Sequence, residues 1–125
     1  MSNIRTDATD TELAILDVLW DRGPSQIRPI VEAVYGEHSA ALHATVKSLL
    51  GRLSEKGLVV CDRGQFAHEY RPVIGREEFV GVQLEQLAKS HFSGALGPML
   101  LALVGRVKLS KQDRNILERI VEKIK

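Results

Sequence analysis

The residues of this chain that could do chemistry gather in one window that contains no acidic side chain. Between residues 38 and 54 the ionisable residues are His38, His43, Lys47 and Arg52. Lysine and arginine can neutralise phosphate groups. The small and hydroxyl residues between them, which could meet a thymine methyl or donate hydrogen bonds to phosphates and base edges, are Ala44, Thr45 and Ser48. The window therefore suggests contact with a polyanion, although the whole chain has a formal net charge of only +1.

A helix over residues 40–56 must present this window to solvent. Its apolar positions fall on one helical stripe, which we expect to face the core: Leu42, Val46, Leu49, Leu50 and Leu53. Gly57 is a natural end for this helix. The opposite face then holds the polar and basic residues, and the early part of such a helix would enter a DNA groove deepest. We therefore expect His43, Ala44 and Lys47 to touch bases and Arg52 to touch backbone.

Two further helices are expected before this one. The first begins near Thr9, where Thr9 and Glu12 have the spacing of a capping box, and Gly23-Pro24 ends it. A short strand over 25–27 follows. Because a proline disfavours helical backbone in the residue before it, we expect Arg28 to be extended and the second helix to run from Pro29 to Tyr35.

After the third helix the apolar period changes to two. Residues 58–62 and 67–71 read as two strands joined by a glycine-containing turn over 63–66, with Pro72 ending the sheet. Arg63 in this turn is placed to reach a flanking DNA backbone. A helix, short strand, two helices and a hairpin follow the order of a winged helix-turn-helix, in which the third helix lies in the major groove.

The remaining residues are expected to be helical. A helix over 76–91 carries Val80, Leu84, Leu87 and Ala88 on one face, and the apolar run 94–107 is broken at Gly97-Pro98. Ser110 and Asp113 repeat the capping spacing before a strongly amphipathic last helix. We divide the chain into a DNA-binding domain over 1–74 and a helical dimerisation region over 75–125. The residues expected at the dimer interface are Leu84, Leu87, Leu100, Leu103, Ile116, Leu117, Ile120, Val121 and Ile124.

Several blocks of the chain resemble the BlaI/MecI penicillinase-repressor family in order. The run 45–59, TVKSLLGRLSEKGLV, is similar to the family signature TTVQTLLNRLVEKGLV. Further similar blocks are Glu12-Leu13 to Leu19-Trp20, Gly23-Pro24, Ala67-His68-Glu69-Tyr70 before Pro72, and Arg76-Glu77-Glu78-Phe79. The resemblance covers nearly the whole chain and keeps the family's length.

This resemblance implies a fold and a function. The fold is mainly α with a small antiparallel β wing, a winged helix-turn-helix followed by a helical dimerisation segment. The function is that of a homodimeric transcriptional repressor on a palindromic operator, with the recognition positions at His43, Ala44, Thr45, Lys47 and Ser48. The family often has tyrosine or tryptophan at the position of His43, and threonine or lysine at that of Ala44, so this chain departs from the family where the operator would be read.

Two regulatory devices of the family are missing from the sequence. The copper-responsive members carry paired cysteines near the C-terminus, and this chain has only Cys61. The antibiotic-responsive members are cleaved at an Asn-Phe bond by a membrane sensor-protease, and that bond aligns with Ala102-Leu103 here. The family resemblance makes a membrane sensor-protease a possible partner, but the residues at Ala102-Leu103 do not support induction by its cleavage.

Other classes of protein have little support. We expect a soluble cytoplasmic protein without membrane insertion, because no long apolar span and no signal-like N-terminus occur. The histidines show no close metal spacing, so no metal or other cofactor is expected. The chain lacks a phosphate-binding glycine loop, an HExxH motif and a coherent Ser/His/Asp set, so we do not expect an enzyme. The alternative is a winged-helix module that binds proteins and not DNA.

Overall fold

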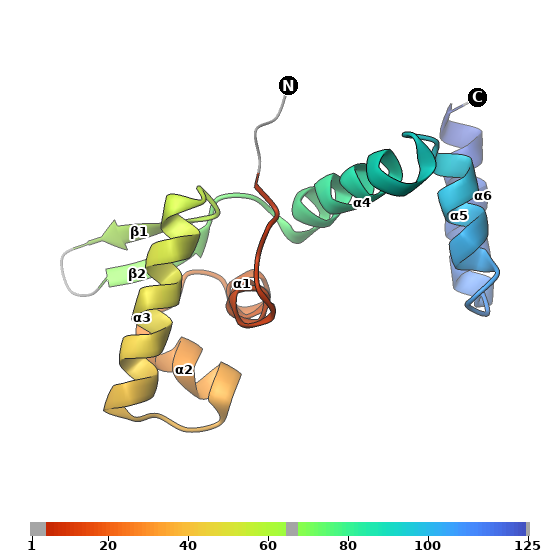
Figure 1. The fold of residues 1–125 in the computed structure, drawn as a ribbon. Coiled ribbons are helices and arrows are strands. Elements are labelled where there is room, and N and C mark those ends of the chain that lie inside the picture. Colours follow the sequence, from red (N-terminus) through yellow and green to blue (C-terminus); the bar gives the residue numbers. More distant parts are fainter. Residues whose placement is uncertain (1–4, 65–67, 125) are drawn as a thin grey trace. The chain divides into compact units, whose positions relative to one another are not determined.

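The computed structural model describes residues 5–64 and 68–124, and it contains six helices and one hairpin within them (Figure 1). The elements in order are α1 (Asp10–Arg22), α2 (Ile27–Tyr35), α3 (Ala40–Glu55), β1 (Val59–Arg63), β2 (His68–Pro72), α4 (Arg76–Phe92), α5 (Leu96–Val104) and α6 (Lys111–Ile124). The chain divides into two compact units, residues 1–83 and 84–125. The first unit has the winged-helix order, and the mainly helical fold class with a small antiparallel wing is confirmed.

Helix α1 begins as its capping residues predict. The backbone N–H of Thr9 donates to Oε1 of Glu12 at 2.9 Å, and the N–H of Glu12 donates to Oγ1 of Thr9 at 3.2 Å. Two N–H groups of the first turn are thus paired by side chains. The helix ends at Gly23, whose φ of +84° suits glycine.

The start of α2 differs from the prediction. The expected strand over 25–27 is reduced to Ser25, which exchanges two backbone hydrogen bonds with Tyr70. The helix begins at Ile27, so Arg28 is helical and its predicted extended backbone is wrong. Pro29 is the third residue of α2, where an N–H has no partner within the helix, and the proline therefore sacrifices no hydrogen bond.

Helix α3 supplies much of the core of the first unit. The N–H of Leu42 donates to Oγ of Ser39 at 3.1 Å, which caps its first turn. Val46, Leu50 and Leu53 are fully buried, while Leu42 and Leu49 are half-buried against the same cluster. The predicted apolar stripe is confirmed, and burial of this stripe turns the opposite face of α3 to solvent.

The wing is a two-stranded antiparallel hairpin in which Cys61 is opposite Tyr70. Strand β1 begins one residue later than predicted, and the predicted first residue of the second strand, Ala67, lies outside the described residues. Pro72 pairs with Val59 within the sheet instead of following it. A proline is tolerated at the end of an edge strand, where no ladder N–H is needed. Residues 65–67, which include the second half of the predicted turn, lie outside the described residues.

The first half of α4 belongs to the winged-helix unit. Phe79 is fully buried in the core, and its ring centroid lies 5.4 Å from that of Trp20. Nε1 of Trp20 donates to the backbone oxygen of Ile74 at 2.9 Å. Arg76 lies over the Trp20 ring and donates to Oδ1 of Asp21 at 2.9 Å. The units consequently divide after residue 83, inside α4, whereas the sequence suggested a division after residue 74.

The second unit consists of helices with little buried surface. Gly97 and Pro98 lie in the first turn of α5 and do not break the helix, so the predicted break is wrong. As at Pro29, a proline in the first turn removes no hydrogen bond, because the N–H groups there have no partner within the helix. The predicted capping box of α6 is present, with hydrogen bonds between Ser110 and Asp113 in both directions. Neither α5 nor α6 contributes a buried residue.

No single helix among the described residues is long and apolar enough to cross a membrane. Only α4 and α5 taken together, with a sharp bend between them, meet the criteria of length and composition.

Candidate nucleic-acid interface

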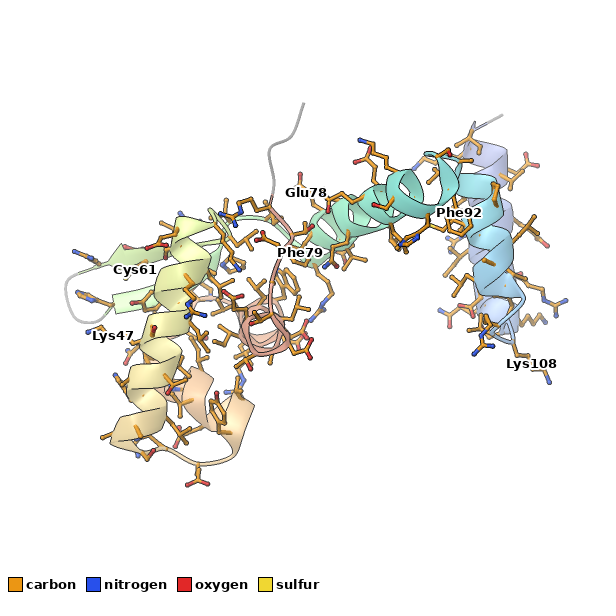
Figure 2. All side chains as sticks on the ribbon, viewed as in Figure 1. Lys47, Cys61, Glu78, Phe79, Phe92 and Lys108 are labelled. Atoms are coloured by element: carbon orange, nitrogen blue, oxygen red, sulfur yellow. The ribbon has the colours of Figure 1, made fainter. Side chains whose placement is uncertain are left out.

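The outer face of α3 carries the residues predicted to read DNA. Ala44, Thr45, Lys47, Ser48 and Arg52 are exposed, and His43 is half-buried. Figure 2 shows Lys47 on the side of α3 that faces away from α1. We call this surface the α3 outer face. It is the solvent-facing complement of the buried stripe, so the packing of Val46, Leu50 and Leu53 determines its orientation.

The cations of this face and of the wing are without ion pairs. Within residues 5–64 and 68–124, Lys47, Arg52 and Arg63 make no salt bridge, whereas Lys56 and Arg76 are both paired with carboxylates. A cation without a carboxylate partner can bind phosphate without first breaking an internal pair. The arrangement therefore suits the release of counterions from a polyanion.

The hydroxyl of Thr45 is partly engaged within α3. Its Oγ1 donates to the backbone oxygen of Ala41 at 3.0 Å. The hydroxyl hydrogen is therefore occupied in this structure, so Thr45 offers its methyl group and acceptor lone pairs to a ligand. The sequence suggested a donor at this position. Among the hydroxyl residues of the α3 outer face, Ser48 is the one whose side chain has no described partner.

The register of the wing places Arg63 on one face and the acidic residues, together with Arg71, on the other. Arg63 pairs with His68 across the hairpin, on the same face as Cys61 and Tyr70. Asp62 pairs with Glu69 on the other face. Arg63 is the last residue of β1 and is exposed, so the sequence placed it one step too far into the turn. The basic end of the wing is thus separated from its acidic pair.

A buried ion pair anchors the C-terminal end of α3. Nζ of Lys56 donates to Oε1 of Glu12 at 2.8 Å and to the backbone oxygen of Asp7 at 2.7 Å. Burial raises the pKa of Glu12, but hydrogen bonds from Lys56 and Thr9 outweigh it and hold that pKa below its ordinary value of 4.5. The pair connects α1 to the residue that caps α3.

A pair of histidines at the start of α3 was missed by the sequence analysis. Nε2 of His38 lies 3.2 Å from Nδ1 of His43, and the two rings meet edge to face. His38 precedes the helix, so helical periodicity carries no information about its position. The described residues contain no group of three His, Cys, Asp or Glu side chains that could hold a metal ion.

The residues predicted at a dimer interface are exposed in this single chain. Their exposed fractions run from 38% for Leu117 to 77% for Ile124. An apolar cavity of about 330 Å³ lies beside four of them and is lined by Leu84, Leu87, Phe92, Met99, Leu100, Ala102 and Leu103. The Ala102-Leu103 bond lies inside helix α5.

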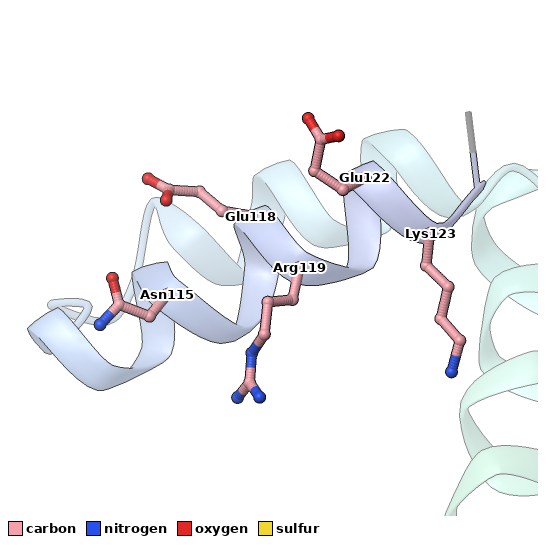
Figure 3. Close-up of a pocket in the computed structure, with 5 residues that line it drawn as sticks. All are labelled: Asn115, Glu118, Arg119, Glu122 and Lys123. Atoms are coloured by element: carbon pink, nitrogen blue, oxygen red, sulfur yellow. The ribbon is translucent and has the colours of Figure 1, made fainter.

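Helix α6 separates its polar and apolar residues. A hollow along one face is lined by Asn115, Glu118, Arg119, Glu122 and Lys123, all from α6 itself (Figure 3). The apolar residues of α6 lie between these polar residues in the sequence and recur with helical spacing: Ile116, Leu117, Ile120, Val121 and Ile124. The hollow is a feature of one polar helix face, so it is not a ligand cavity.

Comparison with known proteins finds one family. The profile of the penicillinase repressor family matches residues 8–123. The transcriptional regulator BlaI of Mycobacterium tuberculosis, from strains CDC 1551 / Oshkosh and ATCC 25618 / H37Rv, is 38% identical over 106 residues, which are 83% of this chain and 76% of that protein. The penicillinase repressor of Bacillus licheniformis is 23% identical over 117 residues, 94% of this chain and 91% of the relative. With its winged-helix unit and a match over nearly its whole length, this chain belongs to the penicillinase repressor family.

Proposed function

We propose that this protein is a transcriptional repressor that binds a palindromic DNA operator as a homodimer. The observation that carries the proposal is the α3 outer face, which is exposed and holds cations without ion pairs among the described residues. The names of the relatives, a transcriptional regulator and a penicillinase repressor, agree with it. The residues proposed to contact DNA are His43, Ala44, Thr45, Lys47, Ser48, Arg52 and Arg63.

These residues divide between base reading and backbone contact. His43, Ala44 and Lys47 lie in the first two turns of α3, the part of a recognition helix that enters the major groove. Arg52 lies in the last turn, and Arg63 ends the first strand of the wing. Both are proposed to bind phosphates, which fix register but carry no sequence information directly.

Dimerisation is proposed through the helices of the second unit. Helix α5 has no charged residue, and it buries none of its side chains in the single chain. Short helices with exposed apolar faces gain their stability from packing against a partner. A second copy of the chain supplies a matching apolar surface, because a twofold interface joins the same patch on both subunits. Two copies also present two α3 helices, as a palindrome requires.

The test replaces Lys47, whose side chain makes no hydrogen bond or ion pair with a described residue. Lys47→Ala should weaken binding to an operator obtained by selection from random duplexes by about 1–3 kcal/mol for each half-site, and weaken binding to unrelated DNA less. The two half-sites of a dimer could double this loss if they act independently. Titrations of both DNAs at one salt concentration measure it, with a melting curve to show that the fold is intact.

Lys108→Ala is the matched control, because it removes the same charge from the loop between α5 and α6. It should leave operator binding unchanged. Operator affinity that stays the same in a folded Lys47→Ala variant would remove α3 from the reading role. Failure of the wild-type protein to bind any duplex would favour the alternative, a winged-helix module that binds proteins.

A further inference from the structure

The histidine pair at the start of α3 bears on what the helix reads. We propose that His38 holds the ring of His43 in one orientation and in the tautomer whose Nε2 carries hydrogen, so that His43 is a donor that disfavours cytosine at one operator position. The inference rests on the DNA-binding function proposed above and assigns a specificity role to His38, a residue outside the expected contact set. The first step concerns the free protein alone.

The contact allows only two arrangements of neutral rings. A separation of 3.2 Å between Nε2 of His38 and Nδ1 of His43 is a hydrogen-bond distance, so one nitrogen carries hydrogen and the other does not. If His38 donates, both rings are Nε2–H tautomers. If His43 donates, both rings are Nδ1–H tautomers. Because a neutral histidine side chain in water favours hydrogen on Nε2, the arrangement in which His38 donates is the more stable.

This arrangement determines what His43 offers to a ligand. The two nitrogens of an imidazole point in different directions, so Nε2 of His43 is directed away from His38. No side chain among the described residues bonds to it, and His43 is half-exposed on the first turns of α3. His43 therefore presents a single free N–H next to the base-reading residues Ala44 and Lys47.

A donor at this place discriminates between bases. In the major groove guanine offers acceptors at N7 and O6, adenine at N7 and thymine at O4, whereas the edge of cytosine offers only a donor at N4. An Nε2–H of His43 is thus satisfied best by guanine, with its two acceptors, and left unpaired by cytosine. The opposite tautomer would reverse this preference, because its Nε2 is an acceptor. His38 therefore acts as a positioning residue, through the orientation and the tautomer of the His43 ring.

The first measurement is made on the free full-length protein. Long-range proton–nitrogen NMR spectra at mildly alkaline pH, where imidazoles are neutral, distinguish the two tautomers. We expect hydrogen on Nε2 of both His38 and His43, with signals assigned by His38→Gln and His43→Gln. Hydrogen on Nδ1 of His43 would overturn the proposal whatever the protein does with DNA.

The second measurement selects binding sites from random duplexes with wild type and variants. His38→Ala frees the ring of His43 to rotate and to populate both tautomers, so it should lower the preference for guanine over cytosine at one position of each half-site, by at most about tenfold, the size of one hydrogen bond, and leave the other positions unchanged. His38→Gln should restore it, because its side-chain amide can donate in place of Nε2. His91→Ala, a histidine on α4, is the control and should select the wild-type sequence.

The outcomes separate this inference from the proposed function. Identical selected sequences for wild type and a folded His38→Ala variant would show that His38 does not act on specificity, and would overturn the inference alone. A loss of binding to all sequences alike would point to a phosphate contact of His43 and would overturn it too. No enriched sequence for the wild type would refute operator recognition itself, and with it the reading role of His43.

Discussion

At the scale of single residues, cations of the same type serve two purposes in this protein. Lys56 and Arg76 are paired with carboxylates and join α1 to α3 and to α4. Lys47, Arg52 and Arg63 have no such partner among the described residues and face solvent. The difference is one of position. Lys56, at the C-terminal cap of α3, lies against the buried Glu12, whereas Lys47 lies on the outer face of α3. The two groups should respond differently to substitution.

Lys56→Met should destabilise the fold by about 1–3 kcal/mol, because it leaves the buried carboxylate of Glu12 without its cation. Lys47→Met is the matched control and should change the free energy of unfolding by no more than about 0.5 kcal/mol. Urea unfolding measures both. Adding Glu12→Gln to Lys56→Met should recover part of the loss, since an amide needs no counter-charge. Equal stabilities of the two lysine variants would contradict a structural role for Lys56.

The lowered pKa of Glu12 predicts a dependence on pH. A carboxyl whose pKa is lower in the folded chain stabilises the fold above its ordinary value of 4.5, and this contribution is lost as the pH falls through the folded pKa. The stability gap between wild type and Glu12→Gln should therefore be widest near neutral pH and narrow as the pH falls below 4.5. Thermal melts across this range test it, and a gap that widens in acid would show the opposite sign.

At the scale of elements, α4 is divided between the two units. Its first turns carry Phe79 into the core of the winged helix, and Arg76 contacts Trp20 and Asp21 of α1. Its later residues lie in the second unit, beside the apolar cavity. The winged-helix unit therefore requires part of a helix that the sequence assigned to dimerisation. The reason is that Phe79 packs into the core beside Trp20, whereas Leu84 and Leu87, farther along the same helix, are exposed.

Truncation tests this division. A chain that ends at Gln83 should fold cooperatively, because it retains Phe79 and the backbone oxygen that accepts from Trp20. A chain that ends at Pro72 should lose about 3–5 kcal/mol, the cost of removing a buried phenylalanine from a core. Calorimetry of the two fragments measures the difference. Equal melting temperatures would place the boundary before α4.

At the scale of the whole molecule, most of the apolar surface of the second unit is uncovered in the single chain. Its helices α5 and α6 bury no residue, and their apolar side chains are exposed. The polar residues of α6 lie along one face of the helix (Figure 3), and its apolar residues fall on the other face by helical spacing. A second copy that covers the apolar face would complete this unit and leave the polar face in water, which is the arrangement proposed for the dimer.

Adjacent residues of α6 provide a matched pair of variants. Ile116→Glu places a charge on the apolar face, and Asn115→Glu places the same charge on the polar face one residue earlier. The first should shift sedimentation from dimer to monomer, because a buried charge without a partner costs several kcal/mol. The second should remain a dimer. Dimers of both variants would exclude this face from the interface.

The features that the sequence determined by itself are those set by short-range chemistry. The capping boxes of α1 and α6, the buried stripe of α3 and the pairing of two strands follow from residues close together in the chain, and the structure has all of them. The outer face of α3 follows from its buried face, because a helix that buries one stripe must expose the other. The fold class could therefore be predicted.

Only the tertiary structure decided the features that depend on residues distant in sequence or on the ends of helices. Glu12 and Lys56 are 44 positions apart, and their pairing follows from how α1 packs on α3. Phe79 belongs to the first unit because the ring of Trp20 lies against it. His38 meets His43 because the extended backbone of Ser39 leads from His38 into the first turn of α3. Periodicity describes one regular element at a time, so it cannot place side chains that meet across a turn or between elements.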